Sequence, residues 1–292
     1  MFAGVHTALI TPYRKNKIDP ATFKKVVDAN FAGGVTGIVP CGTTGESPTL
    51  SHEEHHAVIE LAIKCAKGRG PVIAGTGSNS TDEAVSLTKA AEKAGADASL
   101  QVCPYYNKPS QEGLYQHFKA VAKATSLPII LYSIPGRSGI EIGVETTARL
   151  AADCKNIVAM KEAGGSVERV SQLVAACPAG FEVLSGDDSL TLAFMSVGAV
   201  GVISVASNLI PQVMSDLVRH ALFGRYDAAL ALHKKYYRLF NTFLKLDTNP
   251  VPIKAAMALA GFGEPTLRLP MLGLDHEKTG ILKKTLKELK IV

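Results

Sequence analysis

The sequence predicts a (β/α)8 barrel followed by a C-terminal helical region. Eight short apolar segments rich in β-branched residues recur at intervals of roughly 30 residues, and stretches with helical periodicity separate them. After about residue 224 the strand pattern stops and only helical patterns continue. Eight strand–helix units are the number that closes a barrel. The alternative is an open doubly wound sheet, but AGTGSNS has only two of the glycines of the dinucleotide fingerprint GxGxxG.

The expected strands are apolar and end in polar or glycine-rich residues. They cover residues 4–12, 36–43, 71–77, 98–104, 128–135, 156–163, 181–188 and 199–207. Among the expected helices, 22–34 ends in two glycines, and 80–96 opens with Ser/Thr caps and early acids and closes on Gly95.

Three amphipathic helices are expected at the C-terminal end of the sequence, over residues 225–246, 252–263 and 276–290. We therefore expect a catalytic barrel over 1–224 and a three-helix region over 225–292. The second region shows no motif of its own, so packing or subunit contact is its expected role.

Composition and charge exclude several classes of protein. Of the 292 residues, 47% are hydrophobic and 20% charged, which is typical of a globular protein. The net charge of +5 is spread without a basic block, so a nucleic-acid partner is not expected. No secretion signal or membrane-length apolar run is present, and the five cysteines form no CxxC pair. These features predict a cytoplasmic protein without disulfides and without a structural metal.

A lysine ends the sixth expected strand, NIVAMKEAGG. Alternation places Ile157, Ala159 and Lys161 on one face and Glu162 on the other. If the first face lines the barrel, Ala159 leaves room below the amine. Keeping a lysine neutral at pH 7 costs about 4.6 kcal/mol. A barrel interior without a facing carboxylate would supply desolvation toward that cost, and a neutral amine can attack a carbonyl to give a Schiff base. The alternative is a lysine that extends to solvent.

Other polar residues end neighbouring strands, at the edge of a barrel where active sites form. A phenol can relay protons, and a guanidinium can bind a carboxylate with two hydrogen bonds. The GTTGES turn could bind a small anion, or it could be an ordinary turn between strand and helix. The candidates at this edge are Thr43, Thr44, Tyr106, Tyr132, Arg137, Lys161 and the SGDD segment 185–188.

The segment HEEHH (52–56) matches the zinc-protease pattern HExxH. The same stretch reads as a capping box from Ser51 to Glu54, and no third ligand spacing is evident. A solvated first helical turn or a polar regulatory pocket is therefore favoured over catalytic zinc.

Five motifs in order resemble the dihydrodipicolinate synthase family, within the pyruvate-dependent class I aldolase and N-acetylneuraminate lyase superfamily. They are GTTGES, PYYNKPSQEGLYQHF, LYSIPGR-G, KEAGG and SGDD, and the resemblance covers essentially the whole chain. It implies condensation of pyruvate with aspartate-semialdehyde in lysine and diaminopimelate biosynthesis. The covalent link forms through the protein's own lysine, so no cofactor is expected.

The resemblance also implies roles for individual residues. Lys161 matches the Schiff-base lysine, and Tyr132 the phenol that moves protons to and from the adduct. Thr44 matches the hydroxyl that links this phenol to a second one, Tyr106, contributed by a neighbouring subunit of a homotetramer. The remaining matches are Thr43 with Thr44 for the pyruvate carboxylate, Arg137 for the semialdehyde carboxylate, and the main chain at Gly186 and Ile203 for the pocket wall.

Some members of the family are inhibited by lysine at a subunit interface. The corresponding positions here are Ser47, Pro48, His52, His55, Asn79, Glu83 and Tyr105. Pro48 stands where alanine is common, and Ser133 follows Tyr132 where asparagine is common.

Three alternatives remain open at this point. The first is a sialic-acid or sugar-acid lyase of the same superfamily, although the loop guanidinium of Arg137 suits a short carboxylate better than a polyol. The second is a catalytically silent binding protein, against which the complete set of candidate residues counts. The third is a metal hydrolase that uses HEEHH.

Overall fold

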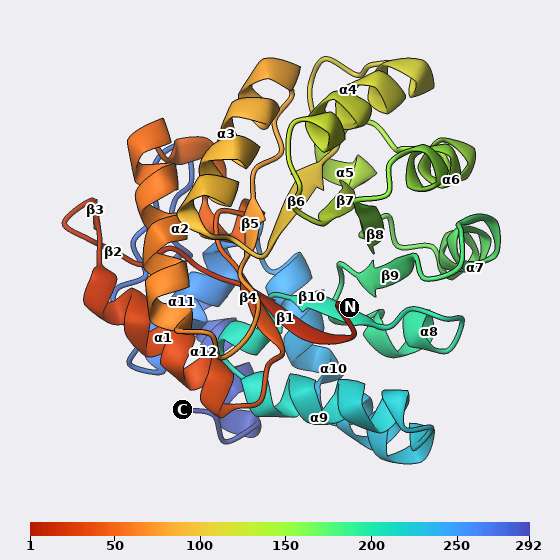
Figure 1. Ribbon diagram of the computed structural model, residues 1–292. Coiled ribbons are helices and arrows are strands. Elements are labelled where there is room, and N and C mark those ends of the chain that lie inside the picture. The colour runs from red at the N-terminus through yellow and green to blue at the C-terminus, as the bar shows by residue number, and fades with distance from the viewer.

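Eight parallel strands form a closed barrel in the computed structural model, which describes residues 1–292 (Figure 1). The hydrogen-bonded order is β4-β1-β10-β9-β8-β7-β6-β5, and the parallel bridge between Ile38 and Val72 joins the two ends. The predicted barrel is therefore confirmed. The strands are β1 (Gly4–Ala8), β4 (Gly37–Val39), β5 (Ile73–Gly75), β6 (Ala98–Val102), β7 (Ile129–Ser133), β8 (Ile157–Glu162), β9 (Glu182–Ser185) and β10 (Gly201–Ser204).

Helices surround the strands, and α10, α11 and α12 lie behind the barrel in the view of Figure 1. A short antiparallel hairpin, β2 (Tyr13–Arg14) and β3 (Lys17–Ile18), follows β1. The helices are α1 (Pro20–Ala32), α2 (His52–Ala66), α3 (Thr81–Ala94), α4 (Gln111–Lys123), α5 (Pro135–Ser138), α6 (Val144–Asp153), α7 (Val167–Ala176), α8 (Thr191–Met195), α9 (Pro211–Leu222), α10 (Tyr226–Lys245), α11 (Val251–Leu259) and α12 (His276–Glu288).

Local sequence signals set the helix ends. Ser51 caps α2 in the expected capping box, because its hydroxyl accepts from the Glu54 amide while the Glu54 carboxylate accepts from the Ser51 amide. Ser80 caps α3, which ends at Gly95 in the left-handed conformation, as expected. None of the helices is both long enough and apolar enough to cross a bilayer.

Two cores hold the barrel together. The larger one fills the layer between strands and helices, and the smaller one fills the barrel interior. The interior core includes Leu100, Tyr132, Ala159 and Ile203, which come from four different strands. The carboxyl ends of the strands, where active sites of barrels form, therefore lie next to a packed interior and not next to an open channel.

A β-bulge changes one expectation for β8. Ile129 of β7 pairs with Ile157, but Ile130 pairs with Ala159, so Val158 is an extra residue in the ladder. Ile157 consequently joins the outer core and not the interior, contrary to the alternation expected from the sequence. Beyond the bulge, Ala159 faces the interior as expected.

The C-terminal region is bonded to the GTTGES turn. The buried Lys254 ammonium of α11 forms an ion pair with buried Glu46 and donates to the Thr11 carbonyl at 2.9 Å. The second Glu46 carboxylate oxygen accepts from the Arg268 amide at 3.0 Å. This region therefore does more than pack against the barrel, since it holds a turn at the carboxyl ends of the strands.

The domain boundary expected near residue 224 stays a prediction.

Candidate active site

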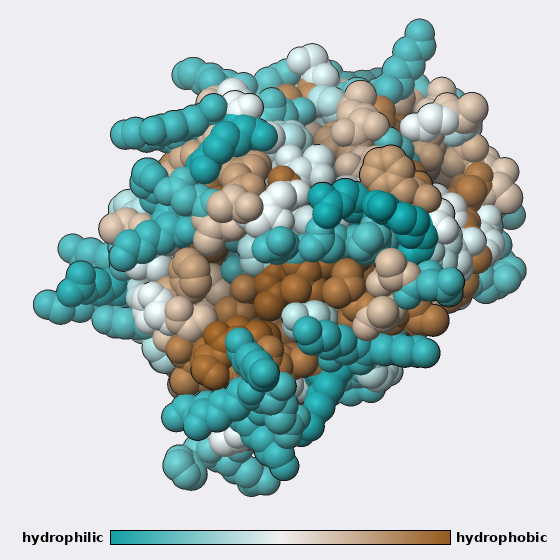
Figure 2. Space-filling model, turned by 90° about the horizontal axis from the view of Figure 1, so that it is seen from below, coloured by the Kyte–Doolittle hydropathy of each residue, from teal (hydrophilic) through white to brown (hydrophobic).

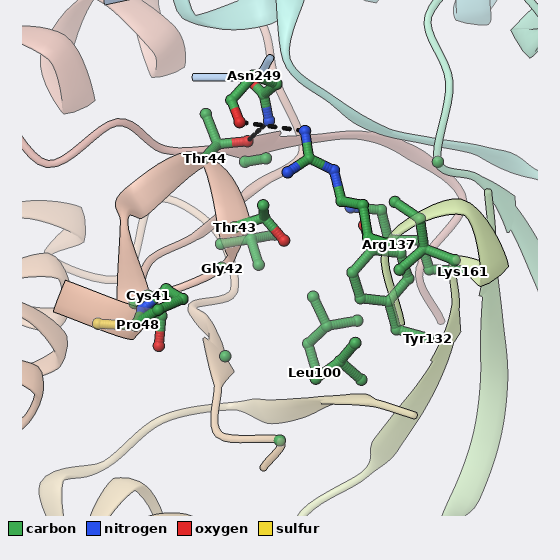
Figure 3. Close-up of a pocket in the computed structure, with 18 of the residues that line it drawn as sticks. Cys41, Gly42, Thr43, Thr44, Pro48, Leu100, Tyr132, Arg137, Lys161 and Asn249 are labelled. Carbon is green, nitrogen blue, oxygen red and sulfur yellow. Dashed lines mark hydrogen bonds between the residues drawn. The ribbon is translucent and has the colours of Figure 1, made fainter. Parts of the chain in front are cut away.

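A cavity of about 520 Å³ opens at the carboxyl ends of the strands. Its lining brings together most of the polar residues that the sequence predicted there, from elements far apart in the chain (Figure 3). The predicted catalytic and substrate-binding residues in this lining are Thr43, Thr44, Tyr132, Arg137, Lys161 and Gly186.

Lys161 lies inside the cavity with only 6% of its surface exposed. Its Nζ is 4.2 Å from the centroid of the Tyr132 ring. The pKa of this amine is lowered to about 8, mainly by burial; the negative charge of Asp188 opposes this shift, and the positive charge of Arg137 adds to it. The amine therefore does not extend to solvent. The expectation that no carboxylate faces it is wrong, because Asp188 lines the same cavity.

Glu162 lies on the other side of β8, as expected from alternation. Its carboxylate accepts from Arg169 Nε at 2.8 Å and from the Gly164 amide at 2.6 Å. Burial raises the pKa of Glu162, and the neighbouring Arg169 guanidinium counteracts this. The charge of the Glu162 carboxylate is therefore balanced by Arg169 outside the barrel. Glu162 forms no ion pair with Lys161, its neighbour in sequence.

Tyr132 is buried beside Lys161, and burial raises the pKa of its phenol to about 12. The Thr43 hydroxyl acts on this phenol and lowers its pKa against the effect of burial. The Thr44 hydroxyl instead accepts from Asn249 Nδ2 at 3.0 Å. The role of Thr44 as the link between Tyr132 and Tyr106 stays a prediction.

Asn249 is a member of the site that sequence reasoning missed. Its side-chain amide donates to the Thr44 hydroxyl, and its main-chain carbonyl accepts from the Arg137 guanidinium at 3.1 Å (Figure 3). One residue thus contacts two residues from different parts of the cavity wall. It lies between α10 and α11, in a segment that shows no periodicity or motif. Only the tertiary fold brings it to the barrel.

Gly186 permits close packing around the lysine. A Cβ at this position would lie 2.6 Å from the Ala163 Cβ and 3.1 Å from the Lys161 Cε. Ile203 lies in the interior core and does not line the cavity, whereas Val205, two residues later, does.

Tyr106 is not in the cavity of its own chain. Its side chain is 89% exposed, and its backbone adopts the left-handed φ of 75°. The Tyr106 amide donates to the Ser138 carbonyl at 3.3 Å, which fixes the loop next to α5. The adjacent Tyr105 does line the cavity.

Comparison with known proteins identifies the family. A sequence model described as the Dihydrodipicolinate synthetase family matches residues 1–289. The chain belongs to this family. A 4-hydroxy-tetrahydrodipicolinate synthase from Persephonella marina is 50% identical over 289 residues, covering 99% of this chain and 98% of the relative. The structure of the 4-hydroxy-tetrahydrodipicolinate synthase from Methylacidiphilum fumariolicum SolV shares 52% identity and a TM-score of 0.98, covering 99% of this chain and 96% of that one.

Two further dihydrodipicolinate synthase structures were solved with a small molecule. The protein from Acinetobacter baumannii was complexed with pyruvate and shares 43% identity, a TM-score of 0.97 and full coverage of both chains. The protein from Cyanidioschyzon merolae had lysine bound and shares 38% identity and a TM-score of 0.96, covering 100% of this chain and 99% of that one. The expected function of a 4-hydroxy-tetrahydrodipicolinate synthase, and with it the lyase class, is confirmed by these full-length relatives.

In this member of the dihydrodipicolinate synthetase family, the expected regulatory residues lie close together. His52 Nε2 is 2.9 Å from Glu83 Oε1, and the Asn79 amide donates to the Tyr105 carbonyl at 3.1 Å. His55 Nε2 lies 2.8 Å from the Gly75 carbonyl oxygen, and burial lowers its pKa. The cavity that holds Lys161 extends to this cluster. The members in its lining are Ser47, Pro48, His52, His55, Glu83 and Tyr105.

HEEHH does not form a zinc pair. His52 contacts Glu83 of α3, whereas His55 contacts the main chain of β5, so the two rings have separate partners. No group of three or more His, Cys, Asp or Glu side chains is placed to hold a metal ion.

Proposed function

We propose that Lys161 condenses with pyruvate and that the resulting enamine attacks aspartate-semialdehyde. The observation that carries this proposal is a buried amine with a pKa of about 8 at the carboxyl end of a barrel strand, beside a phenol and a guanidinium. An amine with this pKa is partly neutral at pH 7 to 8, and a neutral amine can attack a ketone carbon.

The proposed reaction has four steps. Lys161 Nζ attacks the keto carbon of pyruvate, and loss of water gives the imine. Loss of a methyl proton then gives the enamine, whose carbon attacks the aldehyde of the second substrate. Finally the substrate's own amine adds to the imine carbon, the bond to Lys161 breaks, and the ring closes with the lysine regenerated.

Tyr132 is the proposed proton carrier for these steps. Its phenol lies beside the amine, and the Thr43 hydroxyl acts on the phenol and lowers its pKa against the effect of burial. We therefore assign the linking role to Thr43 and leave Thr44 with Asn249 in the wall that surrounds the pyruvate carboxylate. A hydroxyl both donates and accepts, so Thr43 can pass a proton on from the phenol.

Arg137 is the proposed partner of the semialdehyde carboxylate. Its guanidinium lies at the cavity edge and is held through Asn249. A guanidinium with a fixed position can bind a carboxylate with two charge-assisted hydrogen bonds.

We further propose that the protein works as a homo-oligomer, as a homotetramer by its resemblance to the family. The exposed Tyr106 phenol is the observation that supports subunit sharing, because a large aromatic side chain in a fixed loop would otherwise remain in water. In an assembly it would reach the Thr43–Tyr132 pair of a neighbouring subunit. The cluster around His52 and Glu83 would then bind free lysine as an inhibitor.

A coupled assay tests the proposed function. Purified protein is expected to convert pyruvate and aspartate-semialdehyde into a product that a downstream reductase consumes, with loss of reduced nicotinamide cofactor. Lys161→Arg keeps the charge but not a titrating amine, and it should reduce the rate at least about 100-fold. Absence of turnover in the wild-type protein would refute the proposal.

A further inference from the structure

The segment between α10 and α11 lies beside the active-site cavity, and Asn249 is its member in the cavity lining. Ion pairs fix this segment on both sides. Before Asn249, the Asp247 carboxylate pairs with the Lys278 ammonium of α12 at 2.5 Å. After it, the buried Lys254 of α11 pairs with Glu46 of the GTTGES turn. The C-terminal region therefore brings Asn249 to the cavity in a fixed position.

The Arg137 guanidinium has little support from its own element. Arg137 belongs to α5, a helix of only four residues, and it is exposed. Its side chain forms no ion pair, and its one hydrogen bond goes to the Asn249 main-chain carbonyl at 3.1 Å (Figure 3). A long, exposed side chain samples several rotamers unless a contact selects one of them. Since this hydrogen bond uses one of five N–H donors, the others stay available for a carboxylate.

The Asn249 side chain fixes this carbonyl relative to a buried part of the barrel. Its Nδ2 donates to the Thr44 hydroxyl at 3.0 Å, and Thr44 is only 3% exposed. Because the side chain and the carbonyl belong to one residue, the bond to Thr44 restricts where the carbonyl can lie. Arg137 is therefore positioned with respect to the GTTGES turn, through Asn249, and not by its own short helix alone.

We propose that Asn249 is a positioning residue for the second substrate: anchored on Thr44, it places the Arg137 guanidinium where it binds the carboxylate of aspartate-semialdehyde. This inference rests on the proposed function, since it names the residue that prepares the proposed carboxylate site. A guanidinium that is ordered before the substrate arrives loses less entropy on binding. Asn249 bonds to neither Lys161 nor Tyr132, so imine formation with pyruvate is expected to depend on it far less.

Asn249→Ala tests the proposal, because it removes the bond to Thr44 and keeps the main-chain carbonyl. At saturating pyruvate, the KM for aspartate-semialdehyde is expected to rise about 3- to 10-fold, the effect of losing one neutral hydrogen bond. The KM for pyruvate and kcat are expected to stay within about threefold of the wild-type values. A merely structural defect would give the opposite split, since misfolded molecules lower the apparent kcat while the folded remainder keeps its KM.

A double-mutant cycle shows whether Asn249 acts through Arg137. Arg137→Met alone is expected to raise the KM for aspartate-semialdehyde at least about 10-fold, because the charge-assisted hydrogen bonds to the carboxylate are lost. Adding Asn249→Ala to this variant is expected to change the KM by less than about twofold, since the guanidinium that Asn249 positions is gone. An equal rise from Asn249→Ala in both backgrounds would overturn the assignment.

Thr248→Ala is the matched control. Thr248 precedes Asn249, is exposed, and bonds to Asp247 through its amide, not through its side chain. Its KM values for both substrates are expected to match the wild-type values within about twofold. If Asn249→Ala does not fold, as judged by circular dichroism, Thr44→Val removes the same hydrogen bond from the other side. That variant should then raise the KM for aspartate-semialdehyde by the same factor.

Turnover by the wild-type protein separates this inference from the proposed function. If the wild-type protein does not turn over, the proposed function fails, and the positioning role fails with it. If it turns over and Asn249→Ala leaves the KM for aspartate-semialdehyde unchanged, the proposed function stands and the positioning role is overturned. The role is likewise overturned if the variant lowers kcat alone, since Asn249 would then only support the fold.

Discussion

At the scale of single residues, Lys161 owes its chemistry to its surroundings. The small Ala159 side chain below it, the Tyr132 ring and the absence of a side chain at Gly186 leave the amine enclosed. Burial disfavours its charged form, and Asp188 limits the size of that effect. The pKa of about 8 leaves the lysine largely protonated at pH 7, so the expectation of a fully neutral amine is too strong.

Imine formation should rise with pH through about 8. An amine with this pKa is about one-tenth neutral at pH 7 and about nine-tenths neutral at pH 9. The initial rate of borohydride-trapped pyruvate incorporation, measured from pH 6 to 10, is expected to increase roughly ninefold between these values and then level off. A rate that keeps rising to pH 10.5 would mean that the pKa of Lys161 is not lowered.

The pKa of Lys161 also affects stability, with a defined sign. Between pH 8 and 10.5 the unfolded chain holds a proton on this lysine that the folded protein has lost. This residue therefore makes the folded state more stable as the pH rises through that window, and less stable below it.

Thr43 and Thr44 should differ in their effects on turnover. Thr43→Val removes the hydroxyl that acts on the Tyr132 phenol, and kcat is expected to fall about 10- to 100-fold, in the range of lost acid–base assistance. Thr44→Val removes only the bond from Asn249 and is the matched control, with a fall of less than about tenfold. Equal kcat values for the two variants would contradict the assignment of the proton relay to Thr43.

At the scale of elements, a buried ion pair joins α11 to the GTTGES turn. Lys254 has almost no access to solvent, and its ammonium lies 4.2 Å from the centroid of the Tyr13 ring. Glu46 adopts a left-handed backbone of φ 56°, so this pair and the Arg268 amide hold a turn of unusual conformation.

Removing one partner of this pair should be costly. Lys254→Met leaves the Glu46 carboxylate buried without its cation, and the free energy of unfolding is expected to fall by about 3–5 kcal/mol. Urea denaturation followed by circular dichroism measures the change. The double variant Lys254→Met/Glu46→Gln should recover much of the loss, because no buried charge remains.

A surface pair provides the control for this measurement. Lys24 forms an ion pair with Asp28 one turn away on α1, and both side chains are well exposed. Lys24→Met is expected to change the free energy of unfolding by less than about 1 kcal/mol. A change for Lys254→Met no larger than this one would show that the buried pair does not hold the turn.

At the scale of the whole molecule, exposed apolar side chains support the proposed association of subunits. The face seen in Figure 2 shows a band of apolar residues between charged ones. Among the exposed large hydrophobic residues are Leu222, Phe223, Tyr226 and Leu230, at the junction of α9 and α10. Together with Tyr106, these are large apolar side chains that the proposed association would remove from water.

Subunit sharing can be tested by mixing two inactive variants. Tyr106→Phe keeps the Lys161 amine but lacks the Tyr106 hydroxyl. Lys161→Ala keeps the Tyr106 hydroxyl but lacks the amine. After mixing under conditions that exchange subunits, hybrids should contain some sites with both groups, and activity should exceed that of either variant at least about fivefold. Activity that stays at the sum of the two variants would mean that Tyr106 acts in its own chain or not at all.

The sequence predicted the eight strands well because each is a short apolar run with a turn at its end, and a barrel repeats this unit at regular spacing. It could not predict the bulge at Val158, because a strand with one extra residue has the same apolar, β-branched composition as a regular strand. Nor could it distinguish Thr43 from Thr44, adjacent residues of one type whose environments differ only in three dimensions. Asn249 and Lys254 reach the site through long-range contacts that no local pattern contains.

The central claim is that Lys161 forms the covalent bond to pyruvate, and peptide mapping tests it most directly. The protein is incubated with pyruvate, reduced with borohydride, digested and sequenced by mass spectrometry, with Lys155, an exposed lysine just before the same strand, as internal reference. The expected result is a single reduced pyruvate adduct on Lys161, with Lys155 unmodified. An adduct on another lysine, or none in a protein that turns over, would contradict it.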